Sequence, residues 1–492
     1  GPPGASGGAR MPATEFLIAG AGPTGLGAAW RLDALGHRDW RLMEASGVPG
    51  GLARSVVDEH GFTWDLGGHV QFSHYDYFDG LMDDLLGAAG WLRHDRESWV
   101  RVRGRFVPYP FQLNLHRLPP DARDACVRGL ERAAAWPHAA PANFGDWIDA
   151  TFGEGIAAIF MRPYNEKVWA RPPELMAWDW IGDRVATVDL DRVRANIASG
   201  SDDVSWGPNN RFRFPARGGT GAVWRALADR LEARHPGRLQ YGRALVAVDT
   251  QRRRARFADG AEVSYRHLLS TMPLDRLVAI TDLAAALGPI AGALEHSSTH
   301  VVGVALDGRP GEALAGKCWM YFPEDDCPFY RVTHFSHYSP YNVPAPSRQW
   351  SLMAEISESA HRPVDAARAA RDTVDGLAAT GLIRRADVHH TWHCRLEYGY
   401  PVPSLGRDRA LGTILPALEA RGVFSRGRFG AWKYEVSNQD HSLAQGVEVV
   451  DRWLTGAFEE TLHAPEPVDL QALTCHCACP IGSTGVGAVT AK

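Results

Sequence analysis

The 492-residue sequence has no apolar run of about 18 uncharged residues, so it predicts no transmembrane helix. It also lacks the basic and apolar segments of a secretory signal, and we therefore expect a cytoplasmic protein with no membrane partner. Positive charge is not in excess, because 52 basic residues face 57 acidic residues for a net charge of −5. That balance argues against nucleic acid as a partner. The seven cysteines form no disulfide framework, which indicates free thiols.

Tryptophan, by contrast, is abundant, with 17 residues in a chain that has no membrane segment to anchor. Two interpretations fit this count: the rings stack on a flat or sugar-like ligand, or they fill the core. The length and the 45% hydrophobic content allow a sizeable core divided into two or three subdomains. No internal repeat is visible, and the sequence indicates no particular oligomeric state.

The two ends of the sequence differ in composition from the rest. Residues 1–10 have the composition of a linker, and we interpret them as a tag or flexible tail. Residues 463–492 are polar and glycine-rich, which predicts a second flexible tail. This tail holds Cys475, Cys477 and Cys479, a pattern that invites a zinc interpretation. Zinc sites use wider spacings and a second ligand pair, so we predict no metal site.

A nucleotide-binding motif follows the N-terminal tail. The apolar run Glu15–Ala19 predicts a buried strand, and it leads into the glycine-rich turn Gly20–Gly25 and then a helix. Glycines let the backbone approach a pyrophosphate, and a helix N-terminus supplies N–H donors to it. A second strand, Trp40–Met43, ends at Glu44, whose carboxylate can accept hydrogen bonds from ribose hydroxyls. The motif favours a dinucleotide over a glycine turn that serves packing alone.

Paired glycines further along favour FAD over NAD. They occur in Pro49–Ala53, shortly after Glu44, and again in Asp65–His69. Such pairs suit a second close approach to a cofactor that stays bound.

The coarse pattern predicts an α/β fold. We expect a Rossmann-like FAD-binding domain with an inserted helical domain and an antiparallel sheet domain. The predicted boundaries are 11–91 with 208–285 and 425–462 for the FAD-binding domain, 92–207 for the helical domain and 286–424 for the sheet and substrate domain, between the tails 1–10 and 463–492.

Six longer motifs carry a family resemblance. They are Gly67–Tyr75, Val107–Gln112, Met161–Ala170, Phe214–Gly221, Trp319–Arg331 and Gly427–Ser442. In order and content these motifs resemble the UDP-galactopyranose mutases of the eukaryotic type, over roughly Phe16 to Leu462.

The resemblance implies an enzyme that uses flavin without net redox change. Reduced FAD attacks the anomeric carbon of a UDP-hexose through N5, UDP leaves, and the flavin–sugar adduct opens. The ring closes again through a different hydroxyl, so that a pyranose becomes a furanose. NADPH or NADH supplies the reduction before turnover, and the implied substrate pair is UDP-galactopyranose and UDP-galactofuranose.

The resemblance also implies site residues. Catalysis would depend on His69, Arg184, Arg331 and Asn209. The substrate would contact Phe72, Tyr109, Gln112, Tyr164, Asn165, Trp169, Trp319, Tyr321, Tyr400 and Tyr434. The cofactor would contact Gly20, Gly22, Gly25, Glu44, Gly50, Gly51, Leu52, Gly67, Gly68, Arg428, Asn438, Gln439 and Ser442.

Residue chemistry fits these roles. Arg184 and Arg331 match two arginines that meet the leaving diphosphate, where bidentate hydrogen bonds are strong. His69 matches a histidine beside the isoalloxazine ring, and Asn209 matches an asparagine that reaches the sugar hydroxyls. Without the resemblance, each arginine would be interpreted as a surface ion-pair partner, the histidine as structural, and the aromatic group as the core of the helical domain.

Four positions depart from the family pattern: Glu166, Asp326, His337 and Tyr398. Because hydroxyl recognition depends on a few buried polar contacts, these departures bear on the hexose and its 2-substituent. UDP-glucose or a UDP-N-acetylhexosamine is therefore an alternative substrate. A net FAD oxidoreductase of the amine oxidase type, and a flavin-carrying binding protein without catalysis, are alternatives from other classes.

Overall fold

The computed structural model of the chain describes residues 11–135, 139–181, 189–204 and 211–463. The strands are β1 (Thr14–Ala19), β2 (Trp40–Met43), β3 (Ser55–Val57), β4 (Thr63–Asp65), β5 (Trp91–Asp95), β6 (Ser98–Val102), β7 (Arg105–Pro108), β8 (Arg211–Pro215), β9 (Leu239–Gln240), β10 (Leu245–Asp249), β11 (Arg254–Phe257), β12 (Glu262–Ser270), β13 (Glu295–Asp307), β14 (Trp319–Tyr321), β15 (Arg331–Thr333), β16 (Gln349–Glu358), β17 (Val388–Val402) and β18 (Val423–Ser425). The helices are α1 (Pro23–Ala34), α2 (Asp76–Leu86), α3 (Pro120–Ala135), α4 (Phe144–Ile156), α5 (Arg162–Trp169), α6 (Leu190–Ser199), α7 (Gly221–Arg234), α8 (Leu274–Ala279), α9 (Ala284–Ala291), α10 (Phe335–Tyr338), α11 (Ala369–Ala379), α12 (Arg407–Glu419), α13 (Gln439–Thr455) and α14 (Glu460–His463).

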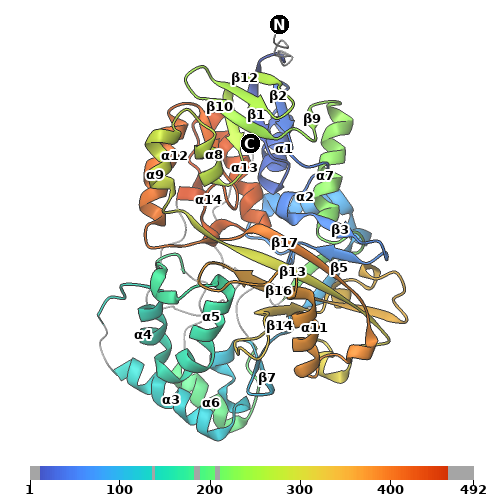
Figure 1. The fold of residues 1–492 in the computed structure, drawn as a ribbon, viewed down its shortest axis with the longest axis vertical. Coiled ribbons are helices and arrows are strands. Elements are labelled where there is room, and N and C mark those ends of the chain that lie inside the picture. The colour runs from blue at the N-terminus through green and yellow to red at the C-terminus, as the bar shows by residue number, and fades with distance from the viewer. Residues whose placement is uncertain (1–10, 136–138, 182–188, 205–210, 464–492) are drawn as a thin grey trace.

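The first sheet has helices on both faces, in the upper half of Figure 1. Its order is β10-β11-β12-β1-β2-β9, with β18 also on β12, and β1 runs parallel to both β12 and β2. Phe16 and Ile18 of β1 join a core with α1, α7 and α13, whereas Leu17 and Ala19 join a core with α8, α9 and α12. A strand buried on both faces requires a continuous apolar run, and the sequence of β1 supplies one.

The second sheet crosses the middle of the molecule (Figure 1). Its order is β17-β13-β16-β15-β14-β6-β7, and its pairs are antiparallel except for β14 with β6. Val302 and Val304 of β13 pack in the core that includes α11. Val301 and Ala305, on the other face, pack in the core that includes α3, α4 and α5. This sheet therefore lies between α11 and the helical layer at the bottom of Figure 1.

The α/β fold class is confirmed, and the detail of residues 92–207 differs from the expected helical pattern. β5, β6 and β7 occupy most of residues 91–108, and the first long helix of this segment, α3, begins at Pro120. β6 reads Ser98–Val102 with buried and part-buried residues in alternation, which is the two-residue period of a strand and not the period of a helix. The domain boundaries stay a prediction.

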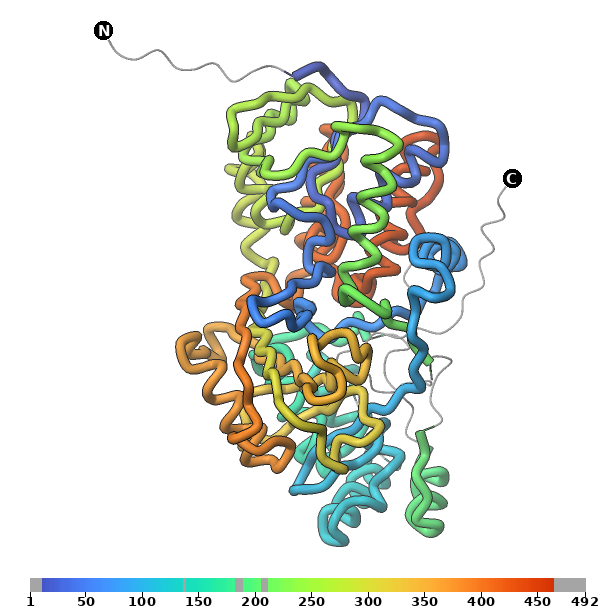
Figure 2. Tube along the Cα trace, turned by 90° about the vertical axis from the view of Figure 1, so that its right-hand side faces the viewer, coloured from blue at the N-terminus to red at the C-terminus, as the bar shows by residue number. Residues whose placement is uncertain are grey.

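The first and last long helices pack directly against each other. Thr24 in α1 donates its hydroxyl hydrogen to the carbonyl oxygen of Ser442 in α13, at 2.7 Å. The close approach depends on glycine, because a Cβ on Gly446 would lie 2.0 Å from the carbonyl oxygen of Thr24. Figure 2 shows the blue and red segments running together in the upper half. Among the described helices, none is both long enough and apolar enough to cross a membrane.

Candidate functional site

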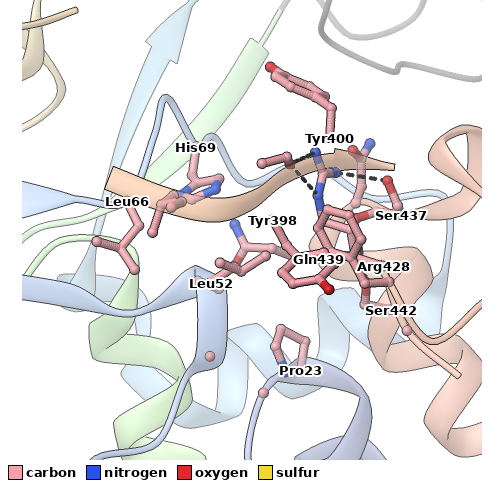
Figure 3. Close-up of a pocket in the computed structure, with 18 of the residues that line it drawn as sticks. Pro23, Leu52, Leu66, His69, Tyr398, Tyr400, Arg428, Ser437, Gln439 and Ser442 are labelled. Atoms are coloured by element: carbon pink, nitrogen blue, oxygen red, sulfur yellow. Dashed lines mark hydrogen bonds between the residues drawn. The ribbon is translucent and has the colours of Figure 1, made fainter. Parts of the chain in front are cut away.

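A cavity of about 520 Å³ opens where α1, α13 and the second sheet meet (Figure 3). Its size is typical of a small-molecule or cofactor site. The predicted site residues that line it are Gly20, Gly22, Glu44, Gly51, Leu52, Gly68, His69, Phe72, Arg331, Tyr400, Arg428, Tyr434, Asn438, Gln439 and Ser442. Figure 3 shows Leu52 and His69 on one side, Arg428 and Gln439 on the other, and Pro23 at the base.

The turn from β1 into α1 forms the base of the cavity. Gly20 has φ of +121°, a conformation that favours glycine. A Cβ on Gly51 would lie 3.2 Å from Cα of Gly22, so two glycine loops meet here backbone to backbone. Gly25 does not line the cavity, and a Cβ there would lie 1.8 Å from the carbonyl oxygen of Gly20. No side chain caps the N-terminus of α1, which leaves it suited to a phosphate.

Glu44 ties these two loops together. Its Oε2 accepts the N–H of Ala21 at 2.7 Å, and its Oε1 accepts the N–H of Ser46 at 2.8 Å. The N–H of Gly50 donates to the carbonyl oxygen of Ala21 at 2.8 Å, so Gly50 braces the turn without lining the cavity. Each carboxylate oxygen of Glu44 keeps a second lone pair for a hydroxyl group.

The N-terminus of α13 faces the same cavity. Asn438 precedes this 17-residue helix without a side-chain cap, and Gln439 and Ser442 follow on the cavity side. The amide of Gln439 is occupied: Oε1 accepts hydrogen bonds from Gln71 at 2.9 Å and Trp224 at 2.7 Å. Gln439 therefore shapes the wall through its own network, while the start of the helix presents backbone N–H groups.

A buried ion pair forms the opposite wall. Arg331 on β15 holds Glu355 on β16 with two hydrogen bonds, 2.6 Å from Nε and 2.8 Å from Nη2. Burial would raise the pKa of Glu355, but Arg331 outweighs it and lowers that pKa. Burial would likewise lower the pKa of Arg331, and Glu355 instead raises it well above its ordinary value. Both side chains thus stay charged away from water.

The loop that carries His69 passes directly over this pair. Gly67 has φ of +128°, and it does not itself line the cavity. A Cβ on Gly68 would lie 2.9 Å from Oγ1 of Thr333 and 3.3 Å from Cζ of Arg331. Glycine is required here because the backbone runs against the guanidinium.

Arg428 is a second buried arginine with a different environment. Its guanidinium donates to the carbonyl oxygen of Gly399 at 2.9 Å and to Oγ of Ser437 at 2.8 Å (Figure 3). Within the described ranges it has no hydrogen bond to a carboxylate. Burial lowers its pKa from the ordinary arginine value, and Arg331 adds a smaller effect in that direction. An arginine pKa still lies far above neutrality, so Arg428 gives this wall a positive charge that no carboxylate among the described residues pairs with.

His69 lies in the cavity as a neutral ring. Burial lowers its pKa to about 4, and Arg331 and Arg428 add to that effect against the opposing charge of Glu355. Its Nδ1 is buried and has no hydrogen-bond partner in the described part of the chain. Phe72 lines the same side. The ring can therefore exchange a hydrogen bond with a ligand, and it carries no charge at pH 7.

The remaining predicted substrate residues form a buried aromatic group beside the cavity. Its members are Tyr109, Gln112, Tyr164, Asn165, Trp169, Trp319 and Tyr321, each with at most 4% of its surface exposed. The ring of Trp169 lies 5.5 Å from Tyr400 and 4.8 Å from Tyr434, two residues that do line the cavity. The five aromatic members belong to the core that includes α3, α4 and α5, and the ring of Trp169 connects them to the cavity wall.

Gln112 is the exception within this core. It is fully buried, and neither its Oε1 nor its Nε2 has a hydrogen-bond partner among the described residues. A buried amide without partners is costly, and native proteins satisfy such groups with protein, water or ligand. A ligand with both donor and acceptor atoms would satisfy this amide.

Comparison with known proteins identifies the family. The model of the flavin containing amine oxidoreductase family matches residues 23–306, more than half of the chain. A crystal structure of reduced UDP-galactopyranose mutase is 48% identical, covers 92% of this chain and 96% of its own, and superposes with a TM-score of 0.88. The chain belongs to the UDP-galactopyranose mutase family.

More distant structures share only the fold with this mutase-family chain. A putative protoporphyrinogen oxidase from Exiguobacterium sp. 255-15 is 16% identical over 90% of this chain and 99% of its own, with a TM-score of 0.64. A CLA-producing fatty acid isomerase from P. acnes is 15% identical over 90% and 99%, with a TM-score of 0.57.

The cavity fits the FAD of the mutase family. Two helix N-termini without side-chain caps and a glycine base suit a pyrophosphate. The buried Arg428 has no carboxylate partner among the described residues, which leaves it able to pair with an anionic group. Arg184 and Asn209, two of the four predicted catalytic residues, lie outside the described residues.

The cavity lining also contains residues that the sequence analysis did not name as site residues, among them Glu355, Arg276 and Thr299. Glu355 left one usable signal, a charged residue in the middle of the otherwise uncharged stretch 350–356. The sequence contains no equivalent signal for the other two.

Of the four departures from the mutase-family pattern, only Tyr398 lines the cavity. Its hydroxyl donates to Asp275 at 2.9 Å and accepts from Arg276 at 3.0 Å. Glu166 is exposed, and Asp326 forms a surface ion pair with Arg101. His337 lies against His94 and His334 away from the cavity.

Proposed function

We propose that this enzyme interconverts UDP-galactopyranose and UDP-galactofuranose with reduced FAD and no net redox change. The observation that carries the proposal is the 48% identity to a UDP-galactopyranose mutase over 92% of the chain. NADPH or NADH is the proposed reductant, and the cytoplasm is the proposed compartment. Bound in its reduced form, FAD supplies a nucleophilic nitrogen for the anomeric carbon of the sugar.

In this proposal, Arg331 stabilises the negative charge of the leaving diphosphate. The guanidinium is held by Glu355 through Nε and Nη2, which fixes its plane before the substrate arrives. The Glu355 carboxylate also cancels part of its charge, so the hydroxyls of Tyr400 and Tyr434 supply further donors. Arg184 is the second cation that the resemblance implies.

His69 acts in this proposal as a neutral hydrogen-bonding group. With a pKa of about 4 it holds no extra proton at pH 7, so it is not the acid that protonates a leaving group. Arg428 adds a fixed cation that has no carboxylate partner in the described part of the chain, and such a cation favours an anionic cofactor or diphosphate.

The uridine end of the substrate is assigned to the aromatic group. An amide side chain offers one acceptor and two donors, and the edge of uracil offers the complementary atoms. Gln112 supplies that amide, because neither of its amide atoms has a hydrogen-bond partner among the described residues. The base and ribose would be enclosed by Tyr109, Tyr164, Asn165 and Trp169. Trp319 would support this group from behind, since its Nε1 donates a hydrogen bond to the hydroxyl of Tyr321 at 2.7 Å.

The test is turnover of UDP-galactofuranose by dithionite-reduced protein, with product separated by chromatography. Formation of UDP-galactopyranose supports the proposal, and its absence contradicts it. A panel with UDP-glucose and UDP-N-acetylhexosamines decides the hexose. Oxygen consumption with amines, and no mutase turnover, would instead indicate an oxidoreductase of the amine oxidase type.

The role of Arg331 is tested by two substitutions. Arg331→Ala is expected to keep FAD bound and to cut turnover severely, since it removes the cation at the diphosphate. Arg331→Lys keeps a charge for Glu355 but loses the two-pronged geometry, so it should fold normally and still turn over poorly. Unchanged turnover in both variants would show that the diphosphate lies elsewhere.

A further inference from the structure

Three histidines meet at a place remote from the cavity. They are His60, in the turn between β3 and β4, and His389 and His390, at the start of β17. One ring nitrogen of each lies within 4.8 Å of the other two. The centroids of His60 and His390 are 4.1 Å apart, and those of His389 and His390 are 5.3 Å apart. None of the three lines the cavity.

A β-bulge brings the two neighbouring histidines together. On a regular strand, consecutive side chains point to opposite faces of the sheet. Here Ala305 of β13 pairs with His390 while Leu306 pairs with Val388, so His389 is an extra residue in β17. Such a bulge changes the direction of a side chain, and it lets His389 approach the same point as His390. Figure 1 shows β17 crossing the molecule near β3.

Asp58 orients His60 and His390. Its Oδ1 accepts the backbone N–H groups of His60 at 2.9 Å and Phe62 at 3.0 Å, which shapes the turn that presents His60. Its Oδ2 lies 2.6 Å from Nε2 of His390, which places the ring hydrogen on Nε2 and the lone pair on Nδ1. That Nδ1 is buried and has no partner within the described ranges.

His389 also has a carboxylate beside one of its ring nitrogens, as His390 has Asp58. Its Nδ1 lies 3.3 Å from Oδ2 of Asp307, which leaves Nε2 for another partner. Glu59 adds a third carboxylate, 3.6 Å from Nε2 of His60. A carboxylate behind an imidazole is the usual arrangement around a bound metal, because it fixes the tautomer and raises the basicity of the ligand.

We propose that His60, His389 and His390 bind a zinc-type divalent cation that joins the β3–β4 turn to β17. Imidazole ligands suit zinc, copper and nickel, and three histidines leave a fourth position for water. Ligand nitrogens around tetrahedral zinc lie roughly 3.3 Å apart, so the three rings, which each have a nitrogen within 4.8 Å of the others, must move closer together to bind it. His60 can supply this movement, because its side chain is 43% exposed on a turn. The three nearby carboxylates balance the charge of the ion.

Zinc titration by calorimetry tests the site in FAD-loaded full-length protein. Cys475, Cys477 and Cys479 are changed to serine in every sample, because the tail thiols would otherwise compete for zinc. We expect one equivalent per chain with a Kd in the micromolar range or tighter. Zinc at about 100 times its Kd is expected to raise Tm by about 2–3 °C.

Substitutions separate the site from chance binding. His60→Ala, His389→Ala and His390→Ala should each weaken binding at least tenfold, and Asp307→Asn should weaken it about 10–100-fold through His389. His361→Ala removes an exposed histidine elsewhere and is the control, with no expected change. His60 and His389 are both exposed, so their variants should keep the zinc-free Tm. Less than half an equivalent bound, or equal affinity in those two variants, would refute the site.

Discussion

The two walls of the cavity are built on opposite principles. Gly20, Gly22 and Gly51 form one wall, the glycine wall, from backbone alone. Arg331, Glu355 and Arg428 form the other, the charged wall, from side chains brought together by three separate segments. A Cβ on Gly20 or Gly51 would crowd its neighbours, at 1.8 Å from Oγ1 of Thr271 and 3.2 Å from Cα of Gly22, whereas the charged wall depends on which charges have partners. Substitutions in the two walls should therefore act differently. In the glycine wall they should crowd the backbone, and in the charged wall they should leave a buried charge without its partner.

The largest effect is expected when the charged wall loses Glu355. Glu355→Ala leaves the buried Arg331 without its carboxylate, and breaking a buried pair costs about 3–5 kcal/mol. Denaturant unfolding of the FAD-loaded protein measures the loss. The matched control is Asp326→Ala, which breaks the surface pair with Arg101 in the same sheet and should cost less than about 1 kcal/mol. Equal losses in the two variants would show that burial of the pair does not matter.

Crowding behind the glycine wall comes next. A Cβ on Gly25 would lie 1.8 Å from the carbonyl oxygen of Gly20, so Gly25→Ala must force the turn open. Overpacking costs about 1–3 kcal/mol, or roughly 10–100-fold in the Kd for FAD. Flavin fluorescence measures that Kd. Gly47→Ala, in the loop after β2 with no atom within 4 Å of the added Cβ, is the control and should bind FAD normally.

Gln112 differs from both walls, because its amide atoms have no hydrogen-bond partner in the part of the chain that the structure describes. Gln112→Leu should leave the free energy of unfolding unchanged or raise it by about 1 kcal/mol, while weakening UDP binding about tenfold. Asn114 is the contrast: buried two residues on, it donates to Pro108, Pro110 and Asp203. Asn114→Leu should destabilise the fold by about 1–3 kcal/mol. Stability and UDP affinity falling together in Gln112→Leu would contradict a ligand-binding role.

Two buried carboxyl groups should differ in how they make the stability of the protein depend on pH. The pKa of Glu355 is lowered by Arg331, whereas burial raises the pKa of Asp65 to about 7 against hydrogen bonds from Ser55 and Thr220. Between the unfolded value of about 3.9 and the folded value, only the folded chain holds this proton. The contribution of Asp65 to stability is therefore complete in acid and is lost as the pH rises through 7.

Asp65→Asn removes that titration and isolates its effect. The Tm of the native chain minus that of the variant should be more positive at pH 5 than at pH 8. Thermal unfolding of both FAD-loaded proteins at the two pH values measures the difference. A gap that does not change with pH would mean that Asp65 is ionised in the folded protein.

The comparison of the walls also explains what the sequence could predict. The glycine wall depends on neighbours in sequence: a strand, a turn and a helix follow one another from Glu15, so spacing alone predicts it. Gly25 and Glu44 stay predicted cofactor contacts, and the contacts that the structure gives them are to Gly20, Ala21 and Ser46.

The charged wall depends on the packing of distant segments. Arg331 and Glu355 pair across two antiparallel strands, and the partner of Arg428 is the carbonyl of Gly399. No spacing rule states that one arginine finds a carboxylate and the other does not. The family motifs include both arginines, so the sequence predicts them as site residues. Which of the two pairs with a carboxylate is visible only in the folded structure.

The packing of α13 on α1 has a consequence for biosynthesis. Thr24 and Ser442, which meet in one hydrogen bond, are 418 residues apart. At about 5–20 residues per second, a ribosome needs about 20–80 s to make the second after the first. Throughout that interval the nascent chain holds half of a cofactor cradle, with the face of α1 that α13 covers still open. The flavin site is therefore completed only near the end of synthesis. A chain that stops before residue 439 lacks α13, and we expect it not to retain flavin.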